Sequence, residues 1–306
     1  MIASVTVTAT GAAQAASAQR EVAVTFDDLP VVSRVFRNVD AQQRITERLL
    51  ASIRRHDVPA IGFVNEGKLA PDGSVDERRV ALLRRWVDAG LELGNHTRSH
   101  LDLHRVALPA YLADIGGGDS VTAALLRSAG RRPRYFRHPF LRTGRDVDTR
   151  RQVERFLAER GYRVAPVTID NSEYIFAAAY ERSDEQAQRR IAAAYLDYMA
   201  RVFDYYERQS VALFGREIRQ VLLLHANALN ADHFAALAEI IKARGYRFVP
   251  LDRALEDPAY ASEDRYTGPA GITWLHRWAL TQGKSGAFFA GEPEVPEAIV
   301  KQAGLP

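Results

Sequence analysis

The chain has 306 residues, 47% hydrophobic and 26% charged, a composition that is ordinary for a globular protein. Its 41 basic and 38 acidic residues leave a formal charge of +3 without a basic tract, which argues against nucleic-acid binding. It has no cysteine, which excludes disulfides, thiolate metal sites and a cysteine nucleophile, so that any metal must be held by histidine and carboxylate. No apolar run approaches ~18 residues, and we therefore expect no membrane span.

The first twenty residues form a separate region. They carry no charged side chain before Arg20, and Ala16-Ser17-Ala18 has the pattern of a signal-peptidase site. The basic start of a secretory signal is missing. We therefore expect residues 1–20 to be the remnant of a truncated signal peptide, with a periplasmic or secreted protein; a disordered tail is the alternative.

Strand and helix patterns alternate from residue 21 onward. Strands are predicted at 21–26, 58–64, 91–94, 135–137, 162–165, 167–169, 221–224 and 246–249, and helices at 40–56, 75–89, 109–129, 147–160, 182–209 and 231–244. This alternation indicates an α/β protein with a mainly parallel sheet. About seven strand–helix units predict a distorted (β/α) barrel rather than an open sheet.

Two segments interrupt or follow this pattern. Residues 175–217 are expected to be a helical insertion within a barrel domain at 21–256, and residues 257–306 an irregular C-terminal extension packed on the barrel. The insertion is rich in tyrosine: Tyr195, Tyr198, Tyr205 and Tyr206. The favoured interpretation is a packing helix, because aromatic residues at helical spacing usually face a core; a substrate platform that narrows a groove is the alternative.

His96 and His100 follow directly after the predicted strand 91–94. Residues at i and i+4 share one face of a helical turn, where two imidazoles can bind one divalent ion. The alternative is two structural histidines at a common spacing.

Asp27 and Asp28 follow the first predicted strand, and in a parallel barrel such strand ends carry the active site. Adjacent carboxylates there can take different roles: one completes a metal site with the two histidines and the other acts as a base. The alternative is a turn or cap pair.

Three further residues stand at later strand ends. Arg137 is followed by Pro139 and could clamp a carboxylate, His225 ends the strand 221–224, and Asp170 follows the segment 167–169. Each has an ordinary structural alternative: an aromatic-rich turn, a core histidine, a turn aspartate. Their recurrence at successive strand ends favours a single catalytic site.

With these residues, the segment 21–255 resembles the polysaccharide deacetylases, the family with the NodB homology domain (carbohydrate esterase family 4). The similar motifs are Thr25-Phe26-Asp27-Asp28, His96-Thr97-Arg98-Ser99-His100, Arg137-His138-Pro139-Phe140, Leu223-Leu224-His225 and the closing strand 245–249. The resemblance implies that Asp28, His96 and His100 bind one divalent metal ion, zinc in most members, with cobalt, nickel or manganese as alternatives.

The resemblance also implies catalytic roles. Asp27 would be the general base that deprotonates the water on the metal, Arg137 would orient Asp27, and His225 would be the general acid for the leaving amine. The backbone N–H of Phe140 would stabilise the oxyanion, and Leu223 would line the acyl pocket. Asp170, or another carboxylate, would hold His225 in its cationic form.

Two residues depart from the family pattern. Tyr174 stands four residues after Asp170, where tryptophan is usual, and His138 lies inside the third motif, where a small residue or proline is common. We expect both to line the substrate site and to alter its wall.

The sequence therefore predicts a metal-dependent hydrolase that removes acetyl or other acyl groups from an N- or O-acetylated carbohydrate, with an acetylated glycan as its partner. A hydrolase of small linear or cyclic amides on the same scaffold is the alternative. A non-catalytic carbohydrate-binding barrel is disfavoured because the set of acidic and histidine residues is complete. Substrate identity, native metal and oligomeric state are left open.

Overall fold

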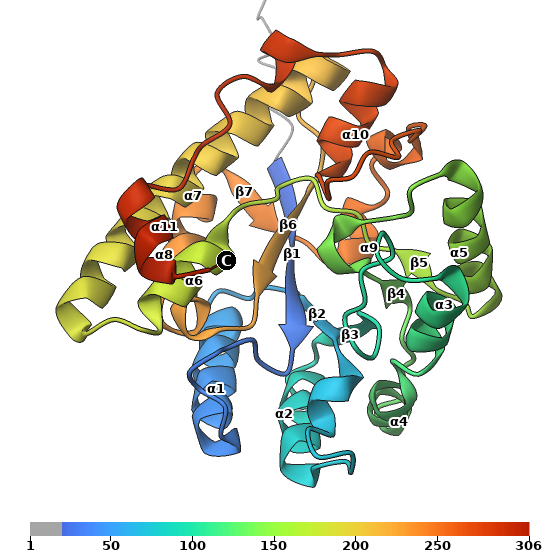
Figure 1. Cartoon of the computed structure of the whole chain (residues 1–306). Coiled ribbons are helices and arrows are strands. Elements are labelled where there is room, and N and C mark those ends of the chain that lie inside the picture. The colour runs from blue at the N-terminus through green and yellow to red at the C-terminus, as the bar shows by residue number, and fades with distance from the viewer. Residues whose placement is uncertain (1–19, 306) are drawn as a thin grey trace, which may run out of the picture.

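The computed structural model describes residues 20–305, which contain one parallel sheet of seven strands (Figure 1). Six strands follow the order β5-β4-β3-β2-β1-β6, and β7 pairs with the start of β1. The strands are β1 (Arg20–Leu29), β2 (Ile61–Val64), β3 (Glu92–Asn95), β4 (Tyr135–Phe136), β5 (Arg163–Val164), β6 (Gln220–His225) and β7 (Tyr246–Phe248).

The central strand β1 is longer than predicted. We expected a loop from Asp27 onward, but Asp27, Asp28 and Leu29 still belong to the strand. The reason is pairing on both sides: Asp27 lies opposite His225 on β6, and Leu29 lies opposite Val64 on β2. The register with β2 shifts between Phe26 and Leu29, and this irregularity turns the two aspartates differently.

The sheet curls into a half-barrel, which agrees with the predicted distorted (β/α) barrel. The segment 167–169, predicted as a strand, forms only a single bridge between Ile169 and Leu222. Thr168 and Ile169 each donate their backbone N–H to the Val221 carbonyl at 3.0 Å. This strip therefore carries the chain from the β5 edge of the sheet to the β6 edge.

Helices cover the outer face of the sheet (Figure 1). They are α1 (Val39–Arg55), α2 (Glu77–Asp88), α3 (Leu108–Gly116), α4 (Ser120–Ser128), α5 (Val147–Glu159) and α8 (Ala228–Ala243). Two short 3-10 helices, η1 (Glu66–Leu69) and η2 (Pro139–Leu141), lie in the loops after β2 and β4. The segment 109–129, predicted as one helix, is divided into α3 and α4.

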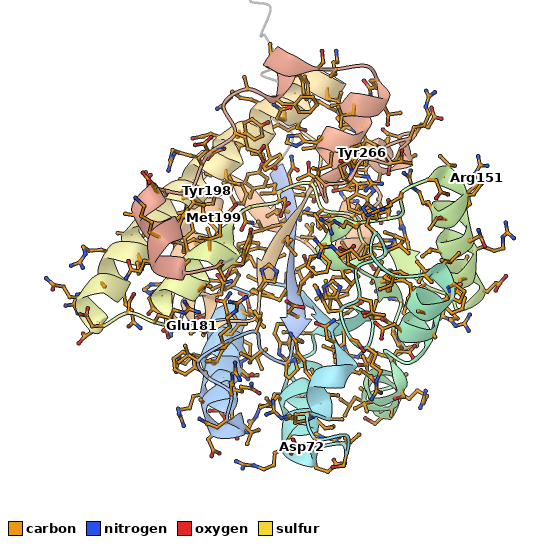
Figure 2. All side chains as sticks on the ribbon, in the orientation of Figure 1. Asp72, Arg151, Glu181, Tyr198, Met199 and Tyr266 are labelled. Atoms are coloured by element: carbon orange, nitrogen blue, oxygen red, sulfur yellow. The ribbon has the colours of Figure 1, made fainter. Side chains whose placement is uncertain are left out.

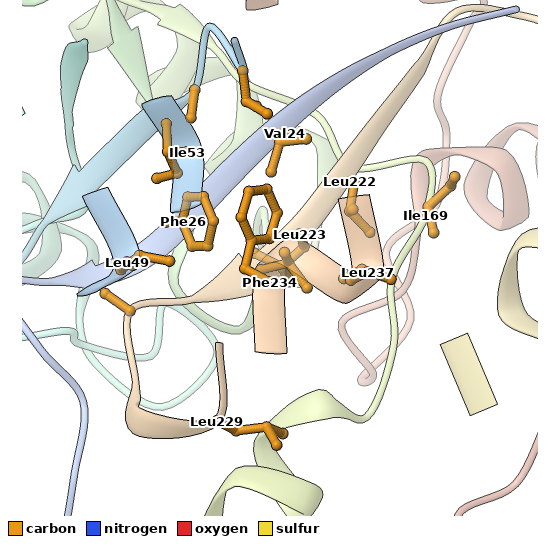
Figure 3. Packing of buried hydrophobic residues seen from close by; sticks show 14 of the residues in the cluster. Val24, Phe26, Leu49, Ile53, Ile169, Leu222, Leu223, Leu229, Phe234 and Leu237 are labelled. Carbon is orange, nitrogen blue, oxygen red and sulfur yellow. The ribbon is translucent and has the colours of Figure 1, made fainter. Parts of the chain in front are cut away.

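The core lies between the sheet and these helices. Phe26 packs edge-on against Trp86 of α2 and Phe234 of α8, with ring centroids 5.8 and 5.4 Å apart. Figure 3 shows Val24 and Leu222 beside this aromatic contact. All of these side chains are buried, so the strand ends that carry polar residues are anchored by a close-packed interior.

The insertion consists of α6 (Glu173–Tyr180) and the long α7 (Glu185–Phe214). Asp184 caps α7 by accepting from the Ala187 N–H, and Gly215 ends it with a φ of 70°. The tyrosines Tyr195, Tyr198, Tyr205 and Tyr206 are buried, which supports the packing interpretation, although Tyr198 also reaches the cavity described below.

The C-terminal extension was expected to be irregular, and this was wrong in part. It contains η3 (Pro258–Ala261), α10 (Trp274–Thr281), η4 (Gly286–Phe289) and α11 (Glu297–Ala303), and the short α9 (Leu251–Ala254) lies just before it. α10 contacts α7, and α11 packs on α6. Buried apolar residues within the extension, such as Trp278 and Ile299, supply the packing that makes these short helices stable.

None of the helices within residues 20–305 is long and apolar enough to cross a membrane. The predicted signal-peptide remnant lies outside the described residues, except for Arg20, which begins β1.

Candidate active site

Polar side chains gather where the parallel strands end, around a cavity of about 980 Å³. The strand ends of β1 and β6 and the loops after β3, β4 and β5 all contribute to it, as expected for a parallel barrel. The predicted site residues that line it are Asp27, Asp28, His96, His100, His138, Phe140, Asp170, Tyr174, Leu223 and His225. Arg137 is buried directly behind it.

Asp28, His96 and His100 bring one ligand atom each within 4.8 Å of one another, as required of a shared metal site. Asp28 Oδ1 lies 3.5 Å from His100 Nε2 and 3.8 Å from His96 Nε2. Two imidazoles and one carboxylate leave further coordination positions open, which is the donor set of a catalytic zinc site.

The histidines converge through an irregular loop, and the helical turn predicted for them is absent. Thr97 and His100 have positive φ values of 64° and 55°, which no helix accommodates. Side chains replace the missing helical hydrogen bonds: the Asn95 amide oxygen accepts from the Thr97 N–H at 2.7 Å, and Thr97 Oγ1 accepts from the His100 N–H at 3.0 Å. Asn65 Nδ2 donates to the His96 carbonyl at 2.6 Å.

Positive φ values are concentrated at this edge of the sheet. Among the described non-glycine residues they occur at Asp57 and, in the site loops, at Asp28, Thr97, His100, Phe140 and Leu141. Such conformations cost roughly 1–3 kcal/mol each and persist only where the surroundings hold them. The site is thus fixed at the expense of local strain, as is common where side chains must be pre-positioned.

Two contacts hold the candidate metal ligands in place. His96 Nδ1 lies 2.8 Å from the Arg137 carbonyl, so a proton on Nδ1 leaves Nε2 free to coordinate. Lys68 Nζ donates to the Asp28 carbonyl at 2.8 Å and lies 3.7 Å from Asp28 Oδ1. Burial would raise the pKa of Asp28, but Lys68 and the neighbouring imidazoles outweigh it and lower that pKa below its usual range. No pattern in the sequence pointed to Lys68.

Asp27 is buried beside Arg137, as predicted. Its Oδ2 lies 3.4 Å from Arg137 Nη1 and 3.7 Å from His96 Nε2, and Arg137 Nη2 donates to Thr25 Oγ1 at 3.0 Å. Burial raises the pKa of Asp27 to about 6, although the Arg137 guanidinium opposes the shift. Asp27 is therefore still mostly ionised at pH 7, with a proton affinity near that of a useful general base.

The carboxylate that holds His225 is Glu173, which the sequence reasoning did not single out. Glu173 Oε2 lies 2.8 Å from His225 Nδ1, while Oε1 accepts from the side-chain amides of Asn227 and Asn230. Burial would lower the pKa of His225, but its bond to Glu173 outweighs burial and raises the pKa to about 9. His225 is therefore a cationic acid at neutral pH.

Asp170 lines the cavity without making the predicted bond to His225. Its Oδ1 accepts from the Asn171 N–H at 2.8 Å, and burial raises its pKa to about 6. The acidic residue three positions later has replaced it because α6 begins there and points Glu173 back at His225. The sequence signal for this contact was Glu173 itself, a second carboxylate directly before Tyr174.

The remaining predicted residues line the cavity in different ways. Phe140 is the second residue of η2, where backbone N–H groups have no partner within the helix. Its ring packs edge-on against His100, with the two ring centroids 4.5 Å apart. His138 is buried, and Tyr111 OH lies 3.2 Å from its Nδ1. Burial lowers the pKa of His138 to about 3, so it is neutral. Leu223 is buried, and Tyr174 is half exposed at the cavity mouth.

The chain is also similar to known proteins, in its sequence and in its fold. Residues 14–164 match the family model described as polysaccharide deacetylase. Among solved structures, the polysaccharide deacetylase Bc1974 from Bacillus cereus is 18% identical with a TM-score of 0.52, over 76% of this chain and 92% of that one. The peptidoglycan deacetylase PdaC from Bacillus subtilis is 21% identical with a TM-score of 0.49, over 78% and 91%.

A third similar structure is BA3943 from Bacillus anthracis, described as a CE4 family pseudoenzyme; it is 15% identical with a TM-score of 0.48, over 78% of this chain and 66% of that one. No curated protein shows significant similarity to the chain. The likeness to Bc1974 supports the fold, and the family model covers β1 to β5 with the residues Asp27, Asp28, His96, His100 and Arg137. Residues 14–164, which carry these five residues, therefore resemble the polysaccharide deacetylase family, and the chain shares the fold of Bc1974.

Proposed function

We propose that the chain is a metal-dependent hydrolase that removes acyl groups, acetyl among them, from an N- or O-acylated carbohydrate. The observation that carries the proposal is the pairing of Asp27 with His225. They lie opposite each other on adjacent strands, one an ionised carboxylate and the other a cationic imidazole, beside three converging metal ligands. A base and an acid of this kind on either side of one bond are what amide hydrolysis requires.

Asp28, His96 and His100 would hold the metal. Two imidazoles and a carboxylate suit zinc, and cobalt, nickel or manganese could take the same donors. A divalent ion there would lower the pKa of a coordinated water and polarise the scissile carbonyl.

Two side chains beside the proposed metal site would carry out the two proton transfers of the reaction. Asp27 would accept the proton of the attacking water, with Arg137 holding its carboxylate in place. His225 would donate its proton to the leaving amine, or to the leaving alcohol of an ester, and Glu173 would stabilise the cation before that transfer. The Phe140 N–H would face the oxyanion, and Leu223 would border the acyl group.

Substitution of the two adjacent aspartates tests these roles. Asp27→Asn should bind metal nearly normally and lose about 10²–10⁴-fold in kcat, because it removes the base and leaves the ligands. Asp28→Asn should weaken metal binding first, and excess metal should restore part of its activity. Metal titration and initial rates on acetylated oligosaccharides would be measured for both. Equal loss of metal, or normal turnover in Asp27→Asn, would show that the roles are misassigned.

A hydrolase of small amides is the second candidate. It is favoured by the cavity wall, to which α6 and the C-terminal extension contribute Tyr174, Ala178 and Val295. Rates on acetylated oligosaccharides and on small linear or cyclic amides, measured with the same metal-loaded protein, separate the two. Full metal binding without turnover of either class would leave a non-catalytic binding protein. Export, expected from residues 1–20, would suit a glycan substrate.

A further inference from the structure

The loop after β4 holds the proposed oxyanion donor in a strained conformation. Phe140 and Leu141 are consecutive residues of η2, with φ values of 57° and 53°. Bulky side chains rarely adopt this left-handed region, and each instance costs roughly 1–3 kcal/mol, so it persists only where contacts impose it. Two backbone hydrogen bonds close the turn itself: the Leu141 N–H donates to the His138 carbonyl at 3.1 Å, and the Arg142 N–H donates to the Pro139 carbonyl at 3.2 Å. Further constraint comes from outside the turn.

The first outside constraint is Gly271, in the C-terminal extension. A Cβ built on Gly271 would overlap the carbonyl oxygen of Phe140 and would lie 2.8 Å from the carbon of that carbonyl. Both atoms belong to the backbone, so no change of rotamer could move them away, and only glycine fits at this position. The extension therefore lies directly on the peptide unit that follows the proposed oxyanion donor.

The second outside constraint is Arg277 of α10, a residue that is only 1% exposed. Its Nη2 donates to Thr143 Oγ1 at 2.6 Å, and its Nη1 donates to the Leu141 carbonyl at 3.4 Å. The guanidinium is planar and its donors have a fixed geometry, so one side chain sets the relative position of two loop residues. A buried arginine is therefore bonded to the end of η2 and to the residue two positions beyond it.

Arg277 is itself held by the extension. Its Nε donates to Asp264 Oδ2 at 2.8 Å, and its guanidinium lies 4.8 and 5.4 Å from the ring centroids of Trp274 and Tyr266. Tyr266, labelled in Figure 2, precedes α10, and its backbone carbonyl accepts a hydrogen bond from Arg150 of α5. Arg277 is thus fixed independently of the loop, and it can impose a geometry on η2.

We propose that Gly271 and Arg277 are positioning residues, which hold η2 so that the Phe140 N–H faces the oxyanion. The inference rests on the proposed function, in which that N–H stabilises the oxyanion. Both residues act through the backbone of η2. If Phe140 and Leu141 relaxed to commoner φ values, the peptide planes of the loop would turn and the N–H would lose its aim. The C-terminal extension, which begins well after the matched residues 14–164, would then be required for catalysis.

The test compares Gly271→Ala and Arg277→Lys with the parent, all zinc-loaded, on tetra-N-acetylchitotetraose. Each variant should lose about 10²–10³-fold in kcat, the effect of losing one oxyanion donor, with KM within about twofold and zinc affinity unchanged. Arg277→Lys keeps the charge but lacks the planar fork. Affinity for a tetrahedral phosphonamidate analogue of the substrate should fall by the same factor as kcat/KM, which lowered stability alone would not cause. Parent-like kcat in both variants would overturn the proposal.

Gln209→Leu is the matched control for a weakened extension. Gln209 Nε2 donates to the Phe288 carbonyl and so attaches η4 to α7, and neither residue lines the cavity. This control should lose stability in urea titration and keep the parent kcat. If it lost kcat as Arg277→Lys does, the effect would come from the stability of the extension, and the positioning role would be wrong. Thr143→Val removes one acceptor of Arg277 and should lower kcat about tenfold, which tests the proposal even if a larger change prevents folding.

Hydrogen exchange of the metal-free protein gives a readout that does not depend on activity. The N–H groups of Leu141 and Arg142 donate within η2, and they should exchange about tenfold faster in Arg277→Lys than in the parent or in Gln209→Leu. Unchanged exchange would contradict the proposal.

The two levels of inference fail separately. If the parent hydrolyses the oligosaccharide and variants with a loosened η2 turn over equally fast, only the positioning role is wrong. If the parent hydrolyses neither the oligosaccharide nor a small acetamide, the proposed function fails, and the positioning role fails with it.

Discussion

His225 and Glu173 form the contact on which the proposed acid role of His225 depends. The Nδ1 nitrogen of the ring lies against a fully buried carboxylate that has two further amide donors, so the carboxylate is held in one orientation. A base so placed keeps the imidazole charged above neutral pH, where an isolated histidine would have lost its proton.

Glu173→Gln should therefore shift the alkaline limit of activity. The folded pKa of His225 is raised, so its acid form is present below about pH 9 and is lost as the pH rises through that value. Without the Glu173 charge, burial lowers the pKa, and the alkaline limb of kcat/KM should move down by about one to three pH units. Asp170→Asn is the control, since Asp170 makes no hydrogen bond to His225 and should shift the limb far less. If Asp170→Asn shifted the alkaline limb of kcat/KM more than Glu173→Gln does, Asp170 rather than Glu173 would be the residue that keeps His225 protonated.

Lys68 would have two opposite effects on the proposed metal site. It fixes the backbone of Asp28, whose φ is 67°, but its ammonium lies 3.7 Å from Asp28 Oδ1 and would repel a cation bound there. We expect electrostatics to dominate: Lys68→Met should tighten zinc binding by about tenfold in a calorimetric titration, because a unit charge a few ångströms away is removed. Lys68→Arg keeps the charge and should bind zinc like the parent. Weaker binding in Lys68→Met would mean that the bond to the Asp28 carbonyl matters more.

At the scale of elements, η1 connects the site to the helical layer. Glu66 is buried, and its carboxylate accepts from the backbone N–H groups of Val121 and Thr122 and from Ser120 Oγ, so it caps the start of α4 from a distant part of the chain. The same short helix carries Lys68, and Asn65 just before it bonds the His96 carbonyl. One turn of 3-10 helix therefore joins α4, the histidine loop and Asp28.

Loss of this distant cap should be costly. Glu66→Ala leaves buried N–H groups of α4 without their acceptor and should lower the free energy of unfolding by about 2–3 kcal/mol in urea titration. Asp146→Ala removes the exposed cap of α5, an Oδ1 that accepts from Thr149, and should cost only about 1 kcal/mol. If the two variants lost equal stability, the buried position of Glu66 would have no energetic consequence.

The elements and the site were predictable from the sequence to different degrees. Alternating patterns located the strands and most helices, and the residues at strand ends, such as Asp27, Asp28 and His225, follow from the rule that parallel strands end together. Loop geometry was beyond this reasoning: the His96–His100 segment was expected to be a helical turn, and only its side-chain hydrogen bonds explain the observed conformation.

Contacts between distant residues account for the other differences. Lys68 meets Asp28 across 40 positions and Glu173 meets His225 across 52, and no local pattern encodes either pair. The helices of the C-terminal extension are short and depend on packing against α6 and α7, so intrinsic periodicity in that segment was too weak to reveal them.

Over the whole molecule, the candidate metal ligands lie on parts of the chain that are far apart in sequence. Asp28 ends the central strand, while His96 and His100 belong to the loop after β3, so a bound ion joins two strands that flank β2. An ion that binds only the folded chain must stabilise it.

Removal of metal should therefore lower thermal stability. At 100 times its Kd, zinc adds about 2.7 kcal/mol, which for a chain of this size corresponds to a rise in Tm of roughly 4–8 °C over the chelator-treated protein. Scanning calorimetry with and without chelator would measure it. Asp28→Asn should show little of this shift at the same zinc concentration, and an equal shift in that variant would place the ion at a different site.

The strip 167–169, which joins the two edges of the sheet, also separates two groups of site residues along the chain. The chain before it supplies the three candidate metal ligands and Asp27, and the chain after it supplies Glu173 and His225. The strip is attached to β6 by backbone hydrogen bonds, which do not depend on side-chain identity. It is therefore a suitable crossover point for chimeras, in which the second half of a homologous barrel could be exchanged to change the acyl group accepted while the metal-binding half is kept.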